Sequence, residues 1–270
     1  MIYPAPVEYI NSVTGPAKIS LLINAPYHMV KGVMERLLQL GVGVEVFFEN
    51  NIIDDVDPRE AKELGRMLKE RAMSCTVHAP FMDLSPGGFD KKIVAITRER
   101  LKKAVELAHH LGAMGVVCHP GYDKWRFDGD EQLWLDSSIE TWTDVLKEAD
   151  SAIPIMLENI FEEEPATFIM LFDYFKDKNL WFCFDTGHFN LFSKVSVEEW
   201  LLPLKERLRH FHLHDNHGKS DEHLPVGTGT FPFRTLKQFI GKMPDPIFVV
   251  EPHTEPSVAE SIQRAREFLS

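Results

Sequence analysis

Apolar runs of strand length alternate with longer amphipathic stretches from residue 18 to the end of the sequence. The apolar runs are rich in Val, Ile and Phe and almost continuous in hydrophobicity, as expected for strands covered on both faces. We predict eight strands, at residues 18–23, 44–48, 75–79, 115–119, 153–158, 180–185, 210–214 and 246–251. Between and after them we predict helices, at residues 29–40, 58–72, 91–111, 131–149, 165–176, 196–208, 233–241 and 256–269.

Local signals mark several helix boundaries. Asp57 and Pro58 supply an N-cap and a first-turn proline. Gly41 and Gly112 each follow a predicted helix, at the position where glycine commonly closes one.

Eight strand–helix repeats in about 250 residues are typical of an α/β protein with a single (β/α)8 TIM barrel. A doubly wound open sheet is the alternative, but no G-x-G-x-x-G follows the first strand. We find no linker and no low-complexity segment. We therefore predict one barrel over residues 18–270 and an N-terminal arm without an assigned role over residues 1–17.

Composition narrows the class of protein further. The 29 Lys and Arg against 41 Asp and Glu give a net charge of −12, which disfavours a nucleic-acid binder with a broad basic face but leaves a local basic groove open. No apolar run is long enough to span a bilayer, and the first residues do not resemble a signal peptide. The three cysteines form no C-x-x-C motif, and a reduced cytoplasmic protein without membrane contact is the simple expectation.

Metal-ligand residue types recur where the predicted strands end. In a TIM barrel the carboxyl ends of all strands meet at one mouth, where active sites lie. Burying several carboxylates and imidazoles together is costly unless a cation pairs with them, so we predict a divalent-metal site there. The six candidates are His78, His119, Glu158, Asp185, His212 and Glu251.

The following loops add three candidates, which brings the number of possible ligands to nine, enough for one metal or a cluster of two or three: His188, Asp221 and His223. A lone His is more often a packing or surface residue, and we assign that role to His28, His109, His110 and His210. His214, His217 and His253 remain undecided. A strand-end carboxylate can instead cap the next helix, which would explain Glu158 or Asp185 singly and explains Glu49 as well as a site role does.

Six segments together resemble the xylose-isomerase-like TIM barrel superfamily over residues 18–268. They are VHAPF (77–81), VVCHPG (116–121), IMLEN (155–159), FDTGH (184–188), HLHDNHGKSDEHLPVGTG (212–229) and VVEPH (249–253). This superfamily contains sugar isomerases and epimerases as well as the endonuclease IV enzymes, also called AP endonuclease family 2.

The resemblance implies ligand sets for each branch. In the epimerase branch, the residues matching Glu158, Asp185, His212 and Glu251 hold one manganese, cobalt or magnesium ion, and the two glutamates form the acid/base pair. In the endonuclease IV branch, all nine matching positions hold three zinc ions. This chain departs from both branches: LLINAPYH replaces the Gly-Ala-His-Val-Ser type of first strand that helps endonuclease IV grip DNA, and an epimerase arginine is replaced around Lys219.

Two functions from different classes follow. The first is a metal-dependent isomerase or epimerase of a sugar, sugar acid or sugar phosphate, working through a metal-stabilised enediolate with Glu158 and Glu251 as acid and base and with His188 and Lys219 as substrate contacts. The alternative is a metal-cluster phosphoesterase that acts on abasic-site DNA or a small phosphoester. A barrel that binds metal without catalysis is a third possibility. We expect a small-molecule substrate, with nucleic acid disfavoured, and a possible homo-oligomer.

Overall fold

Eight parallel strands close into one barrel in chain order. The computed structural model describes residues 20–49, 52–241 and 243–270, and in it β1 pairs with both β2 and β8. The strands are β1 Ser20–Pro26, β2 Gly43–Phe47, β3 Cys75–His78, β4 Val116–Cys118, β5 Ile155–Glu158, β6 Leu180–Asp185, β7 Leu208–Leu213 and β8 Ile247–Val250. The predicted (β/α)8 barrel is confirmed, and the predicted arm over residues 1–17 lies outside the described residues.

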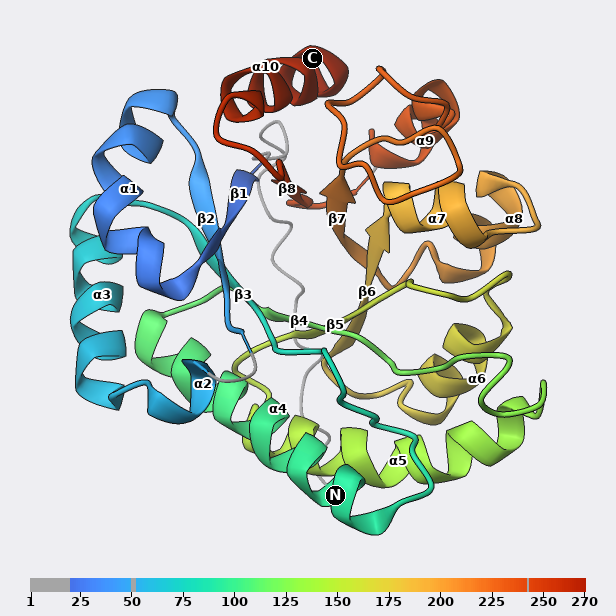
Figure 1. Cartoon of the computed structure of the whole chain (residues 1–270). Helices are drawn as coiled ribbons and strands as arrows, with labels where there is room; N and C mark the ends of the chain where they lie inside the picture. The colour runs from blue at the N-terminus through green and yellow to red at the C-terminus, as the bar shows by residue number, and fades with distance from the viewer. Residues whose placement is uncertain (1–19, 50–51, 242) are drawn as a thin grey trace, which may run out of the picture.

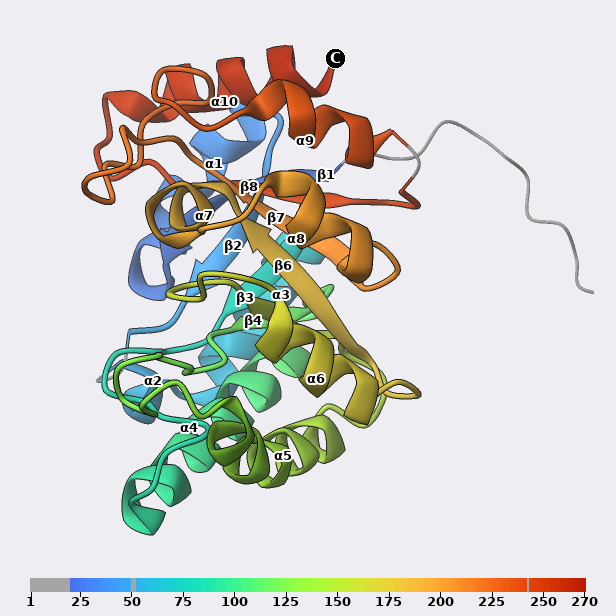
Figure 2. The same cartoon turned by 90° about the vertical axis from the view of Figure 1, so that its right-hand side faces the viewer.

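Helices surround the strands, as Figure 1 shows. They are α1 Tyr27–Leu40, α2 Ile52–Asp55, α3 Pro58–Glu70, α4 Lys91–Leu111, α5 Glu131–Glu148, α6 Ala166–Tyr174, α7 Thr186–Phe192, α8 Val197–Leu204, α9 Phe233–Ile240 and α10 Ser257–Leu269. In both Figure 1 and Figure 2, α9 and α10 lie on the opposite side of the strands from α4 and α5. The short helices α2 and α7 were not expected from the sequence.

The three helix boundaries marked by Asp57 with Pro58, by Gly41 and by Gly112 are confirmed, whereas the helix predicted over 196–208 already ends at Leu204. The Asp57 carboxylate accepts a hydrogen bond from the Arg59 main-chain N–H (2.8 Å) and Pro58 opens α3. Gly41 and Gly112 end α1 and α4 with φ angles of 62° and 68°, the left-handed conformation that glycine adopts without strain.

Alternate residues along each strand serve two different layers. Val44 and Val46 on β2 belong to the large apolar core shared with the helices, whereas Glu45 between them faces the barrel interior. On β6, Cys183 packs with Val117 and Met156 in a separate small interior cluster. The part of the barrel interior far from the carboxyl ends of the strands is therefore apolar, and polar side chains occupy the part near those ends.

The three cysteines, Cys75, Cys118 and Cys183, are buried free thiols whose pKa values are raised by burial. Among the described residues, no helix combines the length and apolar character needed to cross a membrane.

Candidate metal centre

The barrel brings all nine predicted ligand candidates to one mouth. His78, Glu158 and Asp185 are the last residues of β3, β5 and β6. His212 lies within β7, while His119 and Glu251 directly follow β4 and β8. The remaining three come from the start of α7 and from the loop between β7 and α9, namely His188, Asp221 and His223.

Glu158 lies at the centre of this group and is 1% exposed. Its Oε2 lies 3.1 Å from His78 Nε2 and 3.2 Å from His119 Nε2. Its Oε1 lies 3.2 Å from His212 Nδ1 and 3.1 Å from His188 Nδ1. Each oxygen is therefore shared between two histidines that come from different elements of the barrel. No helix begins at Glu158, because α6 starts only at Ala166, so helix capping does not explain this residue.

A second set of possible metal ligands, two carboxylate oxygens, lies around the Nδ1 atom of His212. Asp185 Oδ2 and Glu251 Oε1 each lie 3.5 Å from it. Asp185 also has the capping role that the sequence left open, because its Oδ1 accepts a hydrogen bond from the His188 main-chain N–H (2.7 Å) at the start of α7. One carboxylate thus fixes the short helix α7 and still presents an oxygen to the mouth.

The third set lies in the loop between β7 and α9. Asp221 Oδ2 is 2.9 Å from His223 Nε2 and 3.7 Å from His188 Nε2. The loop folds back on itself, since Asp215 and Leu224 exchange main-chain hydrogen bonds of 2.8 Å. This fold explains how residues beyond the end of a strand reach the mouth.

The undecided histidines separate into two groups. His214 is buried, with Nε2 3.0 Å from Asp185 Oδ2, and its ring stacks on His223 with centroids 3.9 Å apart. His253 stacks on His223 as well, at 3.6 Å. His217 instead pairs with Glu222 on the surface of the same loop and does not line the cavity. His214 and His253 therefore belong to the surroundings of the site.

Three of the candidate histidines have one ring nitrogen tied to a main-chain carbonyl. The Nδ1–H groups of His78, His188 and His223 donate to the carbonyls of Ala79 (2.9 Å), Asn159 (3.2 Å) and Glu251 (2.7 Å). A carbonyl only accepts, so Nδ1 carries a proton in each ring, and Nε2 is the nitrogen that would bind a metal ion once it has lost its own proton. Metal-binding histidines commonly use such a partner to fix the ring and its tautomer.

The electrostatics of the mouth favour positive charge. Burial alone would raise the pKa of Glu158, but the facing His212 and His119 outweigh it and hold that pKa well below its ordinary value. Burial would lower the pKa of His188, but Asp185 and Glu158 raise it to about 10. The imidazoles that face these carboxylates thus favour the charged form of the carboxylates.

The residues fit a divalent-metal centre. The Nδ1 atoms of His212 and His214 are buried without a well-aligned hydrogen bond among the described residues, although Glu158 Oε1 lies 3.2 Å from the first and Asp221 Oδ1 lies 3.7 Å from the second. Divalent ions between these nitrogens and oxygens would satisfy both and replace the protons. Imidazole and carboxylate donors suit zinc, manganese and cobalt.

A cavity of about 800 Å³ opens over the candidate ligands. Its wall includes Phe47 and Phe81, and Phe81 stacks on His119 with centroids 4.2 Å apart. Lys219 and Arg126 also line it, and both are exposed. The cavity thus combines an apolar wall and two cations with an acidic, histidine-rich floor.

Two residues of the barrel interior, Glu45 and His210, were not recognised from the sequence as neighbours of the site. Glu45, in the middle of β2, is fully buried beside His212. The expectation that His210 is a packing or surface residue holds only for its burial, because its ring nitrogens face Glu45 and Cys183. The signal in the sequence that could have found Glu45 is a carboxylate within an otherwise apolar strand. Glu49 is exposed and does not line the cavity.

Known proteins resemble this chain in sequence. A profile described as xylose isomerase-like TIM barrel matches residues 35–270. An uncharacterized protein of Methanocaldococcus jannaschii is 31% identical over 186 residues, which cover 66% of this chain and 64% of that protein. A Mycobacterium ulcerans protein named Probable endonuclease 4 is 29% identical over 133 residues, 47% of this chain and 50% of its own. The chain thus spans between half and two thirds of the length of these relatives.

Solved structures share the whole barrel. A D-tagatose 3-epimerase-like protein superposes with a TM-score of 0.77 at 24% identity, covering 93% of this chain and 97% of the other. Endonuclease IV of Thermus thermophilus superposes with a TM-score of 0.67 at 19% identity, covering 93% and 98%. At these identities the likeness shows the fold alone, and the fold is common to sugar epimerases and to endonuclease IV.

Proposed function

We propose that this chain, which belongs to the xylose isomerase-like TIM barrel family, is a phosphoester hydrolase that works with a cluster of divalent metal ions. The observation that carries the proposal is the position of Glu158. Four histidine nitrogens lie 3.1–3.2 Å from its two oxygens, so neither oxygen is left to take a proton from a substrate carbon. A carboxylate that faces four ligand-type histidines would serve as a ligand to metal ions rather than as a base toward the substrate.

The chain offers donors for three ions. His78, His119 and Glu158 would hold one, and Asp185, His212 and Glu251 would hold a second together with Glu158. His188, Asp221 and His223 would hold the third. Divalent ions at such a centre supply Lewis acidity toward a phosphoryl oxygen and lower the pKa of a water molecule. The main-chain tethers of His78, His188 and His223 keep these rings oriented without a ligand present.

The cavity supports a small phosphoester, or a phosphorylated sugar, as the substrate. Lys219 and Arg126 line it and supply positive charge for an anionic group, whereas the whole chain has a net charge of −12. Phe47 and Phe81 give an apolar wall that excludes water from one side of the substrate. A long DNA duplex fits this charge distribution less well.

Sugar isomerisation or epimerisation is the second candidate, and Glu251 is the residue that favours it. Glu251 lines the cavity, is partly exposed, and has its Oε2 no closer than 3.8 Å to His214 Nε2 and 3.9 Å to His223 Nδ1. A carboxylate with a free oxygen at the cavity is suited to proton transfer. The set of Glu158, Asp185, His212 and Glu251 would also be sufficient for a single ion.

The two functions differ in ion number and in their dependence on His78. We would measure metal content per chain on protein purified without chelators, and assay an aryl phosphodiester, an abasic-site duplex and a panel of ketoses and ketose phosphates. The hydrolase proposal expects about three ions and phosphoester turnover. It also expects His78→Ala to lose one ion and to lower that turnover at least about a hundredfold.

His109→Ala is the matched control, because His109 is exposed in the last turn of α4 and does not line the cavity. It should retain both ions and rate. One ion per chain, epimerisation of a ketose and a His78→Ala variant with an unchanged rate would overturn the hydrolase in favour of the isomerase. A protein that binds no divalent ion would overturn both.

A further inference from the structure

A buried carboxylate lies inside the barrel directly below the proposed metal centre. Glu45, on β2, is fully buried. Its Oε2 accepts a hydrogen bond from the Thr76 hydroxyl (2.8 Å), and its Oε1 accepts one from the Asn24 amide (3.4 Å). On the other side, Oε1 lies 3.0 Å from His212 Nε2 and Oε2 lies 3.2 Å from His210 Nε2.

His212 differs from the three tethered histidines in how its ring is held. His78 and His223 each donate Nδ1–H to a main-chain carbonyl and turn Nε2 toward a carboxylate of the mouth, whereas His188 Nδ1 lies between the Asn159 carbonyl (3.2 Å) and Glu158 Oε1 (3.1 Å). His212 is reversed: its Nδ1 faces Glu158, and its Nε2 faces Glu45. The carboxylate of Glu45 thus occupies the place that a main-chain carbonyl has for the other three.

We propose that Glu45 is the positioning residue of His212, holding its ring with the proton on Nε2 so that the Nδ1 lone pair faces a metal ion. The inference rests on the metal centre of the proposed function, and it adds a residue outside the nine candidates. A carboxylate on the far nitrogen of a ligating histidine fixes the ring and raises its basicity, and loss of such partners typically weakens metal binding 10- to 100-fold.

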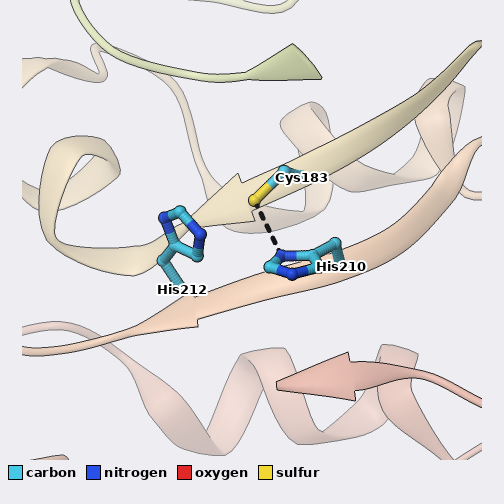
Figure 3. A group of neighbouring side chains, drawn as sticks. All are labelled: Cys183, His210 and His212. Carbon is cyan, nitrogen blue, oxygen red and sulfur yellow. Dashed lines mark hydrogen bonds between the residues drawn. The ribbon is translucent and has the colours of Figure 1, made fainter. Parts of the chain in front are cut away.

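The contacts of His210 supply a second donor to Glu45. Figure 3 shows His210 and His212 on β7, with the Cys183 sulfur on β6 joined to His210 by a dashed line. That contact joins Cys183 Sγ and His210 Nδ1 at 3.2 Å. With the Cys183 thiol as the donor in this contact, Nδ1 accepts the hydrogen. His210 then carries its own proton on Nε2, which faces Glu45.

Four groups that can donate therefore surround Glu45: the Thr76 hydroxyl and the Asn24 amide form hydrogen bonds with it, and the Nε2 atoms of His210 and His212 lie within ion-pair distance. A buried carboxylate is stable when it is surrounded in this way. The same three side chains, Cys183, His210 and His212, could hold an ion among themselves, but a thiol that keeps its proton is a poor ligand. The test below separates these two roles.

The central experiment compares wild type with Glu45→Gln. Glutamine has the shape of glutamate, but its amide N–H₂ donates where a carboxylate oxygen accepts, so it conflicts with a ring N–H. We expect zinc affinity, measured by chelator competition, to fall 10- to 100-fold for at least one ion, with the circular dichroism spectrum unchanged. Glu35→Gln, an exposed glutamate on α1, is the matched control and should bind zinc like wild type.

A ring-nitrogen spectrum gives a readout that a merely structural role would not produce. In long-range ¹H–¹⁵N spectra of zinc-loaded wild type, we expect His212 to bind through Nδ1 and to carry its proton on Nε2. This measurement needs no variant, so it tests the proposal even if Glu45→Gln fails to fold. Coordination through Nε2, or a folded Glu45→Gln protein with wild-type zinc affinity, would overturn the inference.

Two further outcomes are distinguishable. Cys183→Ala should leave the number of bound ions unchanged, and the loss of one ion would overturn the positioning role in favour of an ion held by Cys183 and His210. Wild-type protein without any bound ion would overturn the proposed function, and the inference with it. Wild type that binds ions beside an unaffected Glu45→Gln would overturn the inference alone.

Discussion

Glu162, in the loop between β5 and α6, has a buried carboxyl group that should make the protein less stable as the pH rises. The side chain is 3% exposed. Its Oε2 accepts a hydrogen bond from the Ile160 main-chain N–H (2.7 Å), but its Oε1 has no hydrogen-bond partner among the described residues. Burial outweighs the main-chain hydrogen bonds and raises the pKa of Glu162 from its ordinary 4.5 to about 7.

The size of the effect follows from this difference in pKa. Because the folded protein holds the proton more tightly than the unfolded chain, the free energy of unfolding falls as the pH rises from 4.5 toward 7. A difference from 4.5 to about 7, at about 1.4 kcal/mol for each pKa unit, gives a full loss of about 3 kcal/mol above pH 7. Below pH 4.5 the carboxyl is protonated in both states and costs nothing.

Glu162→Gln removes the titration and keeps an oxygen for the Ile160 N–H. We expect the variant to match wild type near pH 4.5 and to exceed it by about 3 kcal/mol at pH 8, in urea unfolding at a fixed metal concentration. Glu163→Gln is the matched control: Glu163 is more exposed and pairs with Lys124, so its replacement should give no gain that grows with pH. A Glu162→Gln protein with the same stability difference from wild type at both pH values would refute the reasoning.

Three further predictions concern the proposed metal centre. Gly187→Ala should displace His214, because a Cβ there would lie 2.0 Å from His214 Cε1, and we expect roughly tenfold weaker zinc binding in chelator competition; unchanged affinity would contradict this. Removing bound ions with a chelator should lower the melting temperature, since ligands that bind only the folded state stabilise it, and a melting curve unaffected by chelator would count against resident ions. His223→Ala should lose one ion by elemental analysis and keep those near Glu158, whereas loss of every ion would show that the three sets bind cooperatively.

The barrel and the convergence of the six strand-end candidates could be predicted because both follow from periodicity. Strand–helix alternation gives the closed barrel, and a barrel brings the strand ends together whatever the loops contain. The sequence also indicated that Asp185 could cap a helix or face the site, and the structure shows it capping α7 while its other oxygen faces the mouth.

Contacts set by side-chain direction could not be predicted. Glu45 lies in an apolar run, and only the register of β2 against β3 places it beside Thr76. Nothing in the sequence around His210 distinguishes a histidine that only packs in the core from one that lies beside a carboxylate. The raised pKa of Glu162 depends on burial in a loop, for which the sequence carries no periodic pattern.

The main-chain tethers bear on how the protein tolerates mutation. Because the carbonyls that hold His78, His188 and His223 belong to the backbone, no side-chain substitution at positions 79, 159 or 251 deletes them outright. Side chains around these three rings can therefore be substituted while the main-chain carbonyls keep the rings aligned. His212 relies on the side chain of Glu45, so a single codon change can remove its support. Among the groups that hold these four histidine rings, the one that a side-chain substitution can remove therefore lies on β2, a strand that supplies none of the nine ligand candidates.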